Sequence, residues 1–341
     1  MLFRSVITGG AGFIGSHVTE LALRRFPKAQ ITVIDKLTYA GDLRNLHEID
    51  PRGRVKLCVA DLIDAGEWQH EFADADLVLH LAAESHVDQS FVNPSIFTKT
   101  NVFGTENVLL ACIRNSVSRL IHVSTDEVYG EQMNGLCTEE AAFKPTNPYA
   151  ASKAAADLMV MSYQRAWKLS VNVVRSNNVY GVRQFPEKII PRFICNALKG
   201  LPLPIHGSGL NVRHYVSAQD FSAALLLIAE RAESGQIFNI GSHEQYTNVG
   251  IARLICGLVG KDPNRTITYV DDRRFNDCRY GIDDKKIRSL GWQPQRNLQD
   301  DLPAMIDWYR GKLSRYSHFL HVKNWQAPAE QRPTLVQASF N

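Results

Sequence analysis

Two residues four positions apart, Tyr149 and Lys153 in "NPYAASKAAADLM", have side chains suited to removing a proton from an alcohol. On a helix this spacing places both side chains on one face. A phenol holds its proton to about pH 10, but a neighbouring ammonium group stabilises the phenolate and lets it act as a base nearer neutral pH. We therefore interpret Tyr149 as a candidate base and Lys153 as the cation that supports it.

The segment "HVSTDEVYG", residues 122–130, places Thr125, Asp126 and Glu127 side by side after an apolar run. Two carboxyl groups held in different environments can divide into one acid and one base. Oxidation of an alcohol to a ketone acidifies the neighbouring C–H bond, so a carboxylate can remove that proton while a carboxylic acid protonates a hydroxyl leaving the next carbon. The segment favours an elimination of water, with Thr125 assisting at the alcohol. The alternative is a solvated acidic turn or a helix cap.

A glycine motif, Gly9, Gly12 and Gly15 in "VITGGAGFIGSH", lies between a strand-like and a helix-like segment. Glycines at such a turn let backbone amides approach a pyrophosphate at the positive end of a helix. Asp35 ends the next strand-like run, "TVIDK", where a carboxylate binds the ribose hydroxyls of NAD and repels the extra phosphate of NADP. We predict NAD, although Lys36 follows Asp35. A nicotinamide beside Tyr149 would accept the hydride of the alcohol.

The elements that must position these residues alternate along the chain. Short β-branched runs such as "QITVIDK" and "RLIHVSTD" alternate with helical patterns such as "SHVTELALRRF". Near-continuous apolar strands between helices are typical of a parallel sheet covered on both faces. We predict an α/β, doubly wound Rossmann fold, in which Ala82 and Ala83 pass the cofactor and Thr100 lies in or at the start of a helix.

The strand and helix rhythm loosens after about residue 175, where 186–209 carry four prolines and three glycines in "PEKIIPRFICNALKGLPLPIHGSG". We expect a smaller lobe that closes over the carboxyl ends of the strands. The predicted domains are 1–175, a Rossmann domain with the catalytic residues, and 176–315, a second lobe with some chain returning to the first. Residues 316–341 are predicted to be a loosely held tail.

The bulk composition is that of a globular protein, with 45% hydrophobic and 21% charged residues in a chain of 341. A net charge of +3 is too small to indicate a nucleic-acid partner. The six cysteines are scattered without metal-ligand spacing, so we predict buried, reduced thiols and no metal site. The sequence has neither a signal-peptide pattern nor an apolar run of roughly 18 residues, and we expect a soluble, cytoplasmic protein without membrane partners.

Several segments together resemble the nucleotide-sugar 4,6-dehydratases, typified by dTDP-glucose 4,6-dehydratases, of the extended short-chain dehydrogenase/reductase superfamily. The similarity runs from about residue 3 to residue 310 and rests on "TGGAGFIGSH", "DKLTYAG", "AAESHVDQS", "STDEVYG", "NPYAASKA", "SNNVYG", "QFPEKIIPRFI" and "FNIGS". The resemblance implies a homodimer that acts on a nucleotide diphosphate sugar. It assigns oxidation at C4 to Tyr149 with Lys153, C5 proton removal to Glu127, protonation of the C6 hydroxyl to Asp126 and substrate binding to Thr125.

The resemblance also implies two sets of binding residues. The cofactor set is Gly9, Gly12, Phe13, Ile14, Gly15, Asp35, Lys36, Leu37, Thr38, Asp61, Leu62, Ala82, Ala83, Ser85, Thr100, Tyr149, Lys153 and Asn178. The substrate set is Ser85, His86, Thr125, Asn177, Lys188, Arg213, Asn248, Arg273 and Asn276. Arginine suits a diphosphate because its planar fork donates two hydrogen bonds at once, which favours Arg213 for that group.

Departures from the family pattern bear on the nucleotide. His214 stands where an Asp is common, Val182 replaces a usual Pro, and "DRRFNDCRY" has Arg274 and Asn276 where bacterial thymidylyl enzymes have Pro and His. The "FND" pattern is closer to UDP-glucose 4,6-dehydratases. The resemblance as a whole still implies dTDP-glucose as substrate, and these departures keep UDP-glucose or an amino-sugar nucleotide as alternatives.

Three other classes remain as rivals. Nucleotide-sugar 4-epimerases share the glycines and the Tyr149–Lys153 pair but usually lack an Asp–Glu pair, and UDP-glucuronate decarboxylases have Ser where Asp126 stands. A non-catalytic NAD-sensing protein on the same fold would have no use for the complete set of catalytic side chains.

Overall fold

The computed structural model describes residues 3–132, 135–272, 277 and 281–320. Within these residues, seven strands form a parallel sheet in the order β10-β6-β5-β4-β1-β2-β3. The strands are β1 (Arg4–Thr8), β2 (Gln30–Asp35), β3 (Val55–Val59), β4 (Leu77–His80), β5 (Leu120–Val123), β6 (Val171–Ser176) and β10 (Ile237–Ile240). The chain winds from β1 toward one edge and then returns to wind toward the other, which is the doubly wound topology. The predicted fold class is confirmed.

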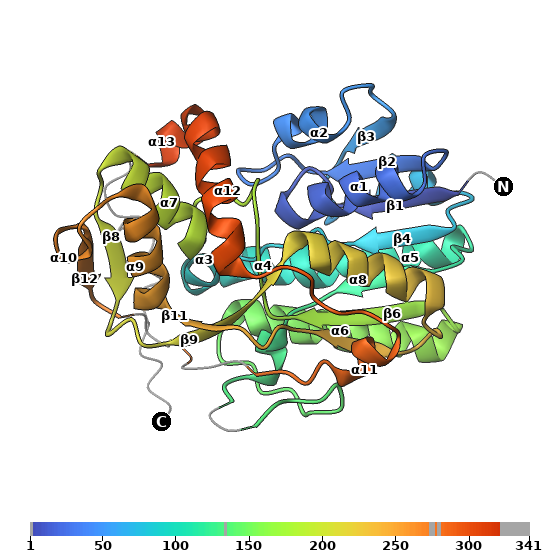
Figure 1. The fold of residues 1–341 in the computed structure, drawn as a ribbon. Helices are drawn as coiled ribbons and strands as arrows, with labels where there is room; N and C mark the ends of the chain where they lie inside the picture. The colour runs from blue at the N-terminus through green and yellow to red at the C-terminus, as the bar shows by residue number, and fades with distance from the viewer. Residues whose placement is uncertain (1–2, 133–134, 273–276, 278–280, 321–341) are drawn as a thin grey trace, which may run out of the picture.

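Helices cover both faces of this sheet (Figure 1). One face carries α1 (Phe13–Arg25) and α8 (Ala218–Arg231), with α2 (Leu43–Ile49) beside α1 and α11 (Lys285–Ser289) beside β10. The other carries the 3₁₀ turn η1 (Glu67–Phe72), α3 (Val87–Val92), α4 (Pro94–Thr98), the π-helical turn η2 (Lys99–Phe103), α5 (Gly104–Arg114) and α6 (Pro148–Trp167). Thr100, predicted to lie in or at the start of a helix, lies in the π-helical turn η2 between α4 and α5.

Alternation along each strand supplies both hydrophobic cores. Ile7 and Val33 pack with α1 and α8, whereas their neighbours Val6 and Ile34 pack with α5 and α6. All four side chains have 0% exposure. Burying an aliphatic side chain of this size contributes about 1.5–3 kcal/mol, so continuous apolar strands are favoured where both faces are covered.

The second lobe lies at the carboxyl ends of the sheet strands, on the left of Figure 1. It contains β7 (Asn178–Tyr180), α7 (Ile189–Lys199), β8 (Leu203–His206), β9 (Val212–Ser217), β11 (Gln245–Thr247), α9 (Asn248–Val259), α10 (Pro263–Thr266), β12 (Ile267–Val270) and α12 (Leu298–Lys312). Its core packs apolar residues of α7, α9 and α12 together. Between its segments the chain returns to the Rossmann sheet to add α8 and β10.

Residues 316–320, the start of the expected tail, are ordered into the last residue of η4 (Leu313–Tyr316) and α13 (Ser317–Leu320). Tyr316 is buried because its ring packs 5.9 Å from the rings of both Phe185 and Tyr309. The expectation of a loose tail is wrong for these five residues, and residues 321–341 lie outside the described part of the chain.

The described cysteines, Cys58, Cys112, Cys137, Cys195 and Cys256, are free thiols, and Cys278 lies outside the described residues. Across the described ranges, no helix combines the length and the hydropathy that a membrane crossing requires.

Candidate active site

The turn between β1 and α1 has no room for side chains at its glycines. A Cβ at Gly15 would lie 2.1 Å from the carbonyl oxygen of Gly9, and Gly9 itself has a φ of +71° and faces the backbone of Ala82. Gly12 caps α1 without a side-chain hydrogen bond. The positive end of α1 thus presents backbone amides where a phosphate can approach.

Asp35, at the end of β2, is held by two backbone amides. Its Oδ2 accepts from Ala11 N at 3.0 Å and its Oδ1 accepts from Leu37 N at 2.8 Å. Burial raises the pKa of Asp35, and these hydrogen bonds oppose the rise. Lys36 turns away to pair with Asp61 at 2.5 Å, so its charge is already matched by a carboxylate. This arrangement suits ribose hydroxyls better than an additional phosphate.

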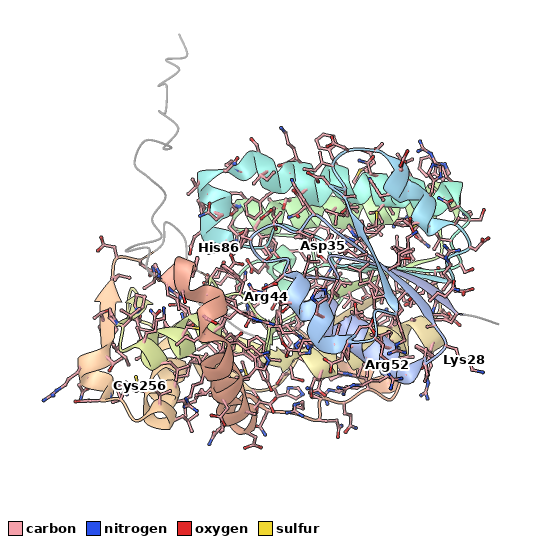
Figure 2. The ribbon with its side chains drawn as sticks, turned by 90° about the horizontal axis from the view of Figure 1, so that it is seen from above. Lys28, Asp35, Arg44, Arg52, His86 and Cys256 are labelled. Carbon is pink, nitrogen blue, oxygen red and sulfur yellow. The ribbon has the colours of Figure 1, made fainter. Side chains whose placement is uncertain are left out.

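Most of the predicted cofactor residues line one groove. They are Gly9, Gly12, Phe13, Ile14, Gly15, Asp35, Lys36, Thr38, Asp61, Leu62, Ala82, Ala83, Ser85, Thr100, Tyr149 and Lys153. Seen from above, Asp35 and His86 lie between Cys256 of the second lobe and Lys28 at the far end of the sheet (Figure 2). The groove fits a dinucleotide, because the glycine cradle, the carboxylate of Asp35 and the Tyr149–Lys153 pair follow one another along it.

Two predicted cofactor residues do not line this groove. Leu37 adopts a φ of 57° and contributes its backbone amide to the Asp35 turn. Asn178 lines the neighbouring pocket of the second lobe, and its assignment to the cofactor stays a prediction. Asn177, whose side chain donates to Asp126, lies between β6 and β7, and Asn178 begins β7.

Tyr149 and Lys153 lie in the first two turns of α6. The helix begins where Asn147 caps it, its Oδ1 accepting from Ala150 N at 2.8 Å, with Pro148 at the first position. The ammonium of Lys153 donates to the carbonyl of Val123 at 2.7 Å. Burial lowers the pKa of Lys153 to about 8, and the charge of Asp157 opposes this effect.

The hydroxyl of Tyr149 stays protonated in the substrate-free protein. Burial and the charge of Glu127 raise its pKa, whereas a hydrogen bond with Thr125 works in the opposite direction. A positive charge near this phenol is therefore needed before it can act as a base.

Asp126 and Glu127 follow β5 in the 3₁₀ turn η3 (Asp126–Tyr129) but have different surroundings. Asp126 is 4% exposed, and its Oδ2 accepts from Asn177 Nδ2 at 2.6 Å. Burial, followed by the charge of Glu127, raises the pKa of Asp126 to about 7. Glu127 accepts from Asn147 Nδ2 at 2.9 Å, and burial raises its pKa against the opposing effects of Asn147, Lys188 and Arg213.

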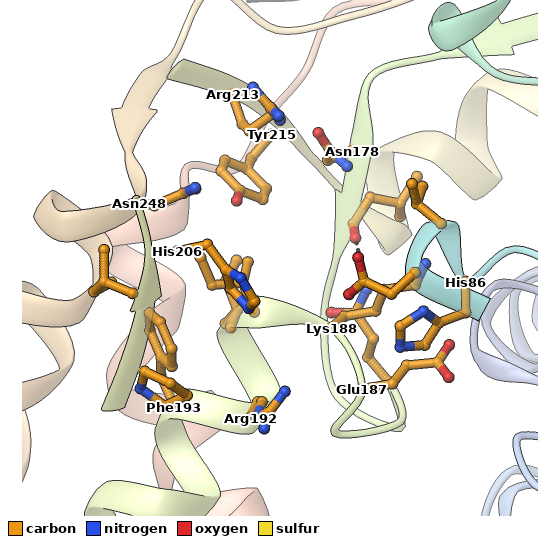
Figure 3. A pocket seen from close by; sticks show the side chains of 18 of the residues that line it. His86, Asn178, Glu187, Lys188, Arg192, Phe193, His206, Arg213, Tyr215 and Asn248 are labelled. Carbon is orange, nitrogen blue, oxygen red and sulfur yellow. Dashed lines mark hydrogen bonds between the residues drawn. The ribbon is translucent and has the colours of Figure 1, made fainter. Parts of the chain in front are cut away.

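A second pocket opens beside Glu127, between the two lobes (Figure 3). Arg213, Tyr215 and Asn248 line it from the second lobe, and His86 and Lys188 lie on the opposite wall. Gln184, Glu187 and Lys188 line both this pocket and the cofactor groove, so the two spaces adjoin. The ammonium of Lys188 donates to the carbonyl of Ser85 at 2.6 Å.

The predicted substrate residues are thus distributed over several positions. His86, Lys188, Arg213 and Asn248 line the pocket, Ser85 lines the groove beside it, and Thr125 and Asn177 are buried around Asp126. Arg273 and Asn276 lie outside the described residues.

Sequence reasoning missed several pocket residues. Asn147, His206 and Tyr215 also line the pocket, together with Asn178, which was predicted only for the cofactor. For Asn147 the signal was present, since Asn-Pro directly before Tyr149 is a helix-start pattern. For His206 and Tyr215 no local pattern marks the position, because the fold of the second lobe alone brings them to the pocket.

The sequence also matches the model of a known protein family. A family model described as GDP-mannose 4,6 dehydratase matches residues 6–305. The chain belongs to this family. The predicted relationship to nucleotide-sugar 4,6-dehydratases of the extended short-chain dehydrogenase/reductase superfamily is confirmed.

Individual relatives extend the comparison. A trifunctional Arabidopsis thaliana protein, named UDP-glucose 4,6-dehydratase, 3,5-epimerase and 4-keto-rhamnose reductase, is 44% identical over 310 residues, 89% of this chain and 46% of that protein. The chain spans about half the length of this relative. A solved dTDP-glucose 4,6-dehydratase from Streptomyces venezuelae, with NAD bound, is 40% identical with a TM-score of 0.88 and covers 92% of this chain and 98% of its own.

The same fold also supports a different activity. A UDP-glucose 4-epimerase from Thermotoga maritima has a TM-score of 0.84 at 28% identity, covering 91% of this chain and all of its own. The backbone therefore does not separate a dehydratase from an epimerase, and the side chains around Tyr149 must do so.

Proposed function

We propose that this dehydratase-family chain is an NAD-dependent hydro-lyase that converts dTDP-glucose to dTDP-4-keto-6-deoxyglucose and water. The observation that carries the proposal is the Asp126–Glu127 pair beside Tyr149, in which the pKa of Asp126 is raised to about 7. A carboxyl group of this kind can hold a proton near neutral pH and deliver it to a leaving hydroxyl.

The first stage is oxidation at C4 of the hexose. NAD, when bound, supplies the hydride acceptor at C4 and the donor that later returns this hydride to C6. Tyr149 removes the proton of the C4 hydroxyl, Lys153 stabilises the resulting phenolate and Thr125 holds the hydroxyl through its own hydrogen bond. The groove residues Gly12, Gly15 and Asp35 suit the pyrophosphate and a ribose of this cofactor.

The second stage is loss of water across C5 and C6. The 4-keto group acidifies the C5 hydrogen, and Glu127 accepts that proton as the C5–C6 double bond forms and gives it back to C5 when the hydride reaches C6. Asp126 gives its proton to the C6 hydroxyl, whose C–O bond breaks to release water. Asn177 donates a hydrogen bond to Asp126, and Asn147 donates one to Glu127. Each carboxyl group thus has its own surroundings, which suits one to act as the acid and the other as the base.

The nucleotide sugar is held in the pocket between the lobes. Arg213 is assigned to the diphosphate, and Lys188 and His86 on the opposite wall approach the sugar. Asn248 lies at the start of α9, near Arg213 in the same wall (Figure 3). The dinucleotide groove adjoins this pocket, which supports transfer between the two ligands.

UDP-glucose is the second candidate substrate, favoured by the 44% identity to the Arabidopsis thaliana protein. An amino-sugar nucleotide would use the same acid and base. An epimerase is disfavoured because reversing a C4 centre needs no proton donor at the position of Asp126. A non-catalytic NAD sensor is disfavoured because Tyr149, Lys153, Asp126 and Glu127 are all present.

We also propose a homodimer that works in the cytoplasm. Exposed apolar side chains on the outer face of η2 and α6 support the dimer: Phe103 is 52%, Leu158 56% and Trp167 55% exposed. Burying such side chains against a second copy would remove them from water.

The test incubates the purified protein with dTDP-glucose and, separately, with UDP-glucose, and follows the mass of the nucleotide sugar. Loss of one water without net accumulation of reduced cofactor is expected. The nucleotide sugar that reacts faster shows whether the enzyme prefers thymine or uracil in its substrate. The Tyr149→Phe variant is the matched control and should leave both masses unchanged. An isomeric product of unchanged mass, resolved by chromatography, would instead establish an epimerase, and no reaction with either would exclude both glucose nucleotides.

A further inference from the structure

A row of buried polar side chains lies beneath α6 and has no part in the chemistry described above. His80 on β4, His122 on β5 and Arg175 on β6 point to the face of the sheet that α5 and α6 cover, and Asp157 reaches the row from α6. Their exposures are 2%, 0%, 1% and 0%. Burying charged groups costs free energy unless they are paired. These four side chains lie in an otherwise apolar layer, which suggests that they have a function.

Asp157 is the centre of this row. Its Oδ2 accepts from the Nε of Arg175 at 2.9 Å, and its Oδ1 lies 3.4 Å from Nε2 of His122. Arg175 is fixed in turn, because one guanidinium nitrogen donates to the hydroxyl of Tyr129 at 2.8 Å and to the carbonyl of Glu139 at 3.1 Å. The rings of Tyr129 and Phe143 lie against the guanidinium. The carboxylate of Asp157 therefore has little freedom to move.

The position of Asp157 relates it directly to the catalytic pair. Tyr149, Lys153 and Asp157 follow one another at intervals of four residues along α6, so the three side chains share one helix face. Lys153 donates to the carbonyl of Val123, the residue next to His122 on β5. Asp157 thus lies one helical turn beyond Lys153, on the helix face that also carries Tyr149.

Burial disfavours the charged form of Lys153, and Asp157 is the group that opposes this. Burial lowers the pKa of Lys153 to about 8, while the charge of Asp157 raises it. For Asp157 itself, burial favours the neutral acid, but His122, Arg175 and Lys153 together lower its pKa below the ordinary value. The carboxylate is therefore charged over the pH range in which the enzyme would work.

We propose that Asp157 is a positioning residue for the Tyr149–Lys153 pair: anchored by Arg175, its carboxylate keeps the Lys153 ammonium charged one helical turn from the phenol. The inference rests on the proposed roles of Tyr149 and Lys153. Asp157 contacts no reacting atom and acts only through Lys153.

Other titratable groups near Tyr149 and Lys153 also affect the pH dependence of this pair. Lys153 is within electrostatic reach of His80 on β4 and His122 on β5, and burial lowers the pKa of both, so they stay neutral. Asp157 also raises the pKa of Tyr149 on α6 and that of Tyr129 in η3, after the larger effect of burial. Asp126 and Glu127 face Tyr149 from η3. Removing the charge of Asp157 lowers the pKa of Lys153, so rates that need the ammonium should fall at a lower pH.

The experiment isolates C4 oxidation in a Glu127→Gln background, where the elimination base is absent. The NAD-loaded protein is mixed rapidly with dTDP-glucose, or with UDP-glucose if that is the reactive nucleotide. Formation of reduced nicotinamide is then followed by absorbance from about pH 6 to about pH 10. On the alkaline side of the pH profile, called the alkaline limb, the oxidation rate falls as Lys153 loses its proton. In the Asp157→Asn variant of this background, the alkaline limb should shift to lower pH by about 1 unit.

Two variants separate this role from a structural one. Arg175→Lys keeps the carboxylate but weakens its anchor, and should lower the melting temperature while leaving the alkaline limb in place. Asp157→Asn combined with Arg175→Met removes both charges, avoids an unpaired buried guanidinium and should show the same limb shift as Asp157→Asn. If Asp157→Asn alone does not fold, this double variant carries the test.

An alkaline limb that stays in place in folded variants without the Asp157 charge would overturn the inference, as would an equal shift in Arg175→Lys. If the Glu127→Gln protein with Asp157 unchanged forms no reduced nicotinamide with either nucleotide sugar, the proposed function is refuted. The inference about Asp157, which rests on that function, is then refuted as well.

Discussion

The cofactor groove and the sugar-nucleotide pocket adjoin each other but are built in different ways. The groove depends on backbone: Gly9 and Gly15 approach other backbone atoms too closely for any side chain, and an added Cβ at Gly12 would make a tight contact of 3.2 Å. The pocket depends on side chains, with Glu127, Lys188, Arg213 and Asn248 arriving from distant parts of the chain. A backbone site is sensitive to any added atom, whereas a side-chain site responds to the chemistry of each residue.

The groove and the pocket also differ in how the charges of their acidic side chains are balanced. In the groove, backbone amides and one ion pair balance the charges of Asp35 and Asp61. At the pocket, Glu127 lines the wall and Asp126 is buried next to it, and both have raised pKa values. The groove is arranged for binding, and the catalytic pair is arranged for proton transfer.

The largest effect is expected from Gly15→Val in the groove. Its Cβ would lie 2.1 Å from the Gly9 carbonyl oxygen and displace the phosphate turn. The NAD content of the purified protein, measured after denaturation, should fall to background. Gly257→Ala in α9, where an added Cβ meets nothing within 4 Å, is the matched control and should keep its NAD. Full NAD content in a folded Gly15→Val protein would contradict a backbone-built groove.

Asp126→Asn should come next, lowering the rate of water loss by about 10² to 10⁴-fold. Reduced cofactor should then accumulate, because C4 oxidation does not use Asp126. In the unchanged protein, Asp126 must be protonated, so the elimination rate should fall as pH rises above about 7, its raised pKa. Asp88→Asn, at a carboxylate that lines the pocket, serves as control. An unaltered rate and pH profile in Asp126→Asn would remove this residue from the chemistry.

Arg213→Lys should have a moderate effect confined to the pocket. Lysine keeps the charge but loses the planar fork, so KM for the nucleotide sugar should rise about tenfold, equivalent to about 1.4 kcal/mol. NAD content should not change, since Arg213 does not line the groove. Steady-state kinetics and NAD analysis of the same preparation test both statements, and a loss of NAD would show that the two regions are not separable.

Lys36→Gln should have the smallest effect. Its ion pair with Asp61 is partly exposed, with 49% of the lysine side chain accessible, and such pairs contribute about 0–1 kcal/mol. Denaturant unfolding should give nearly the same stability as the unchanged protein, and NAD binding should weaken only slightly. A large loss of either would mean that the rim of the groove depends on a side-chain pair as much as the pocket does.

Most of the groove could be predicted from sequence because its parts are close in the chain. Gly9 to Gly15 form one turn, and Asp35 ends the next strand, so local patterns identify them. Asn178 shows where this reasoning stops: its place in a pair of asparagines did not reveal which side chain faces the pocket and which supports Asp126. Only the direction of the chain beyond β6 decides that.

The amino-acid sequence by itself determined the parallel sheet, the glycine turn and the Tyr149–Lys153 spacing, because each follows from local geometry with a period of two or 3.6 residues. The tertiary structure decided the rest. It buried Asp126 and raised its pKa, turned Lys36 to Asp61, brought His206 and Tyr215 to the pocket, and placed Asp157 between Arg175 and His122. These outcomes depend on desolvation and on contacts between residues far apart in the chain, which no local pattern contains.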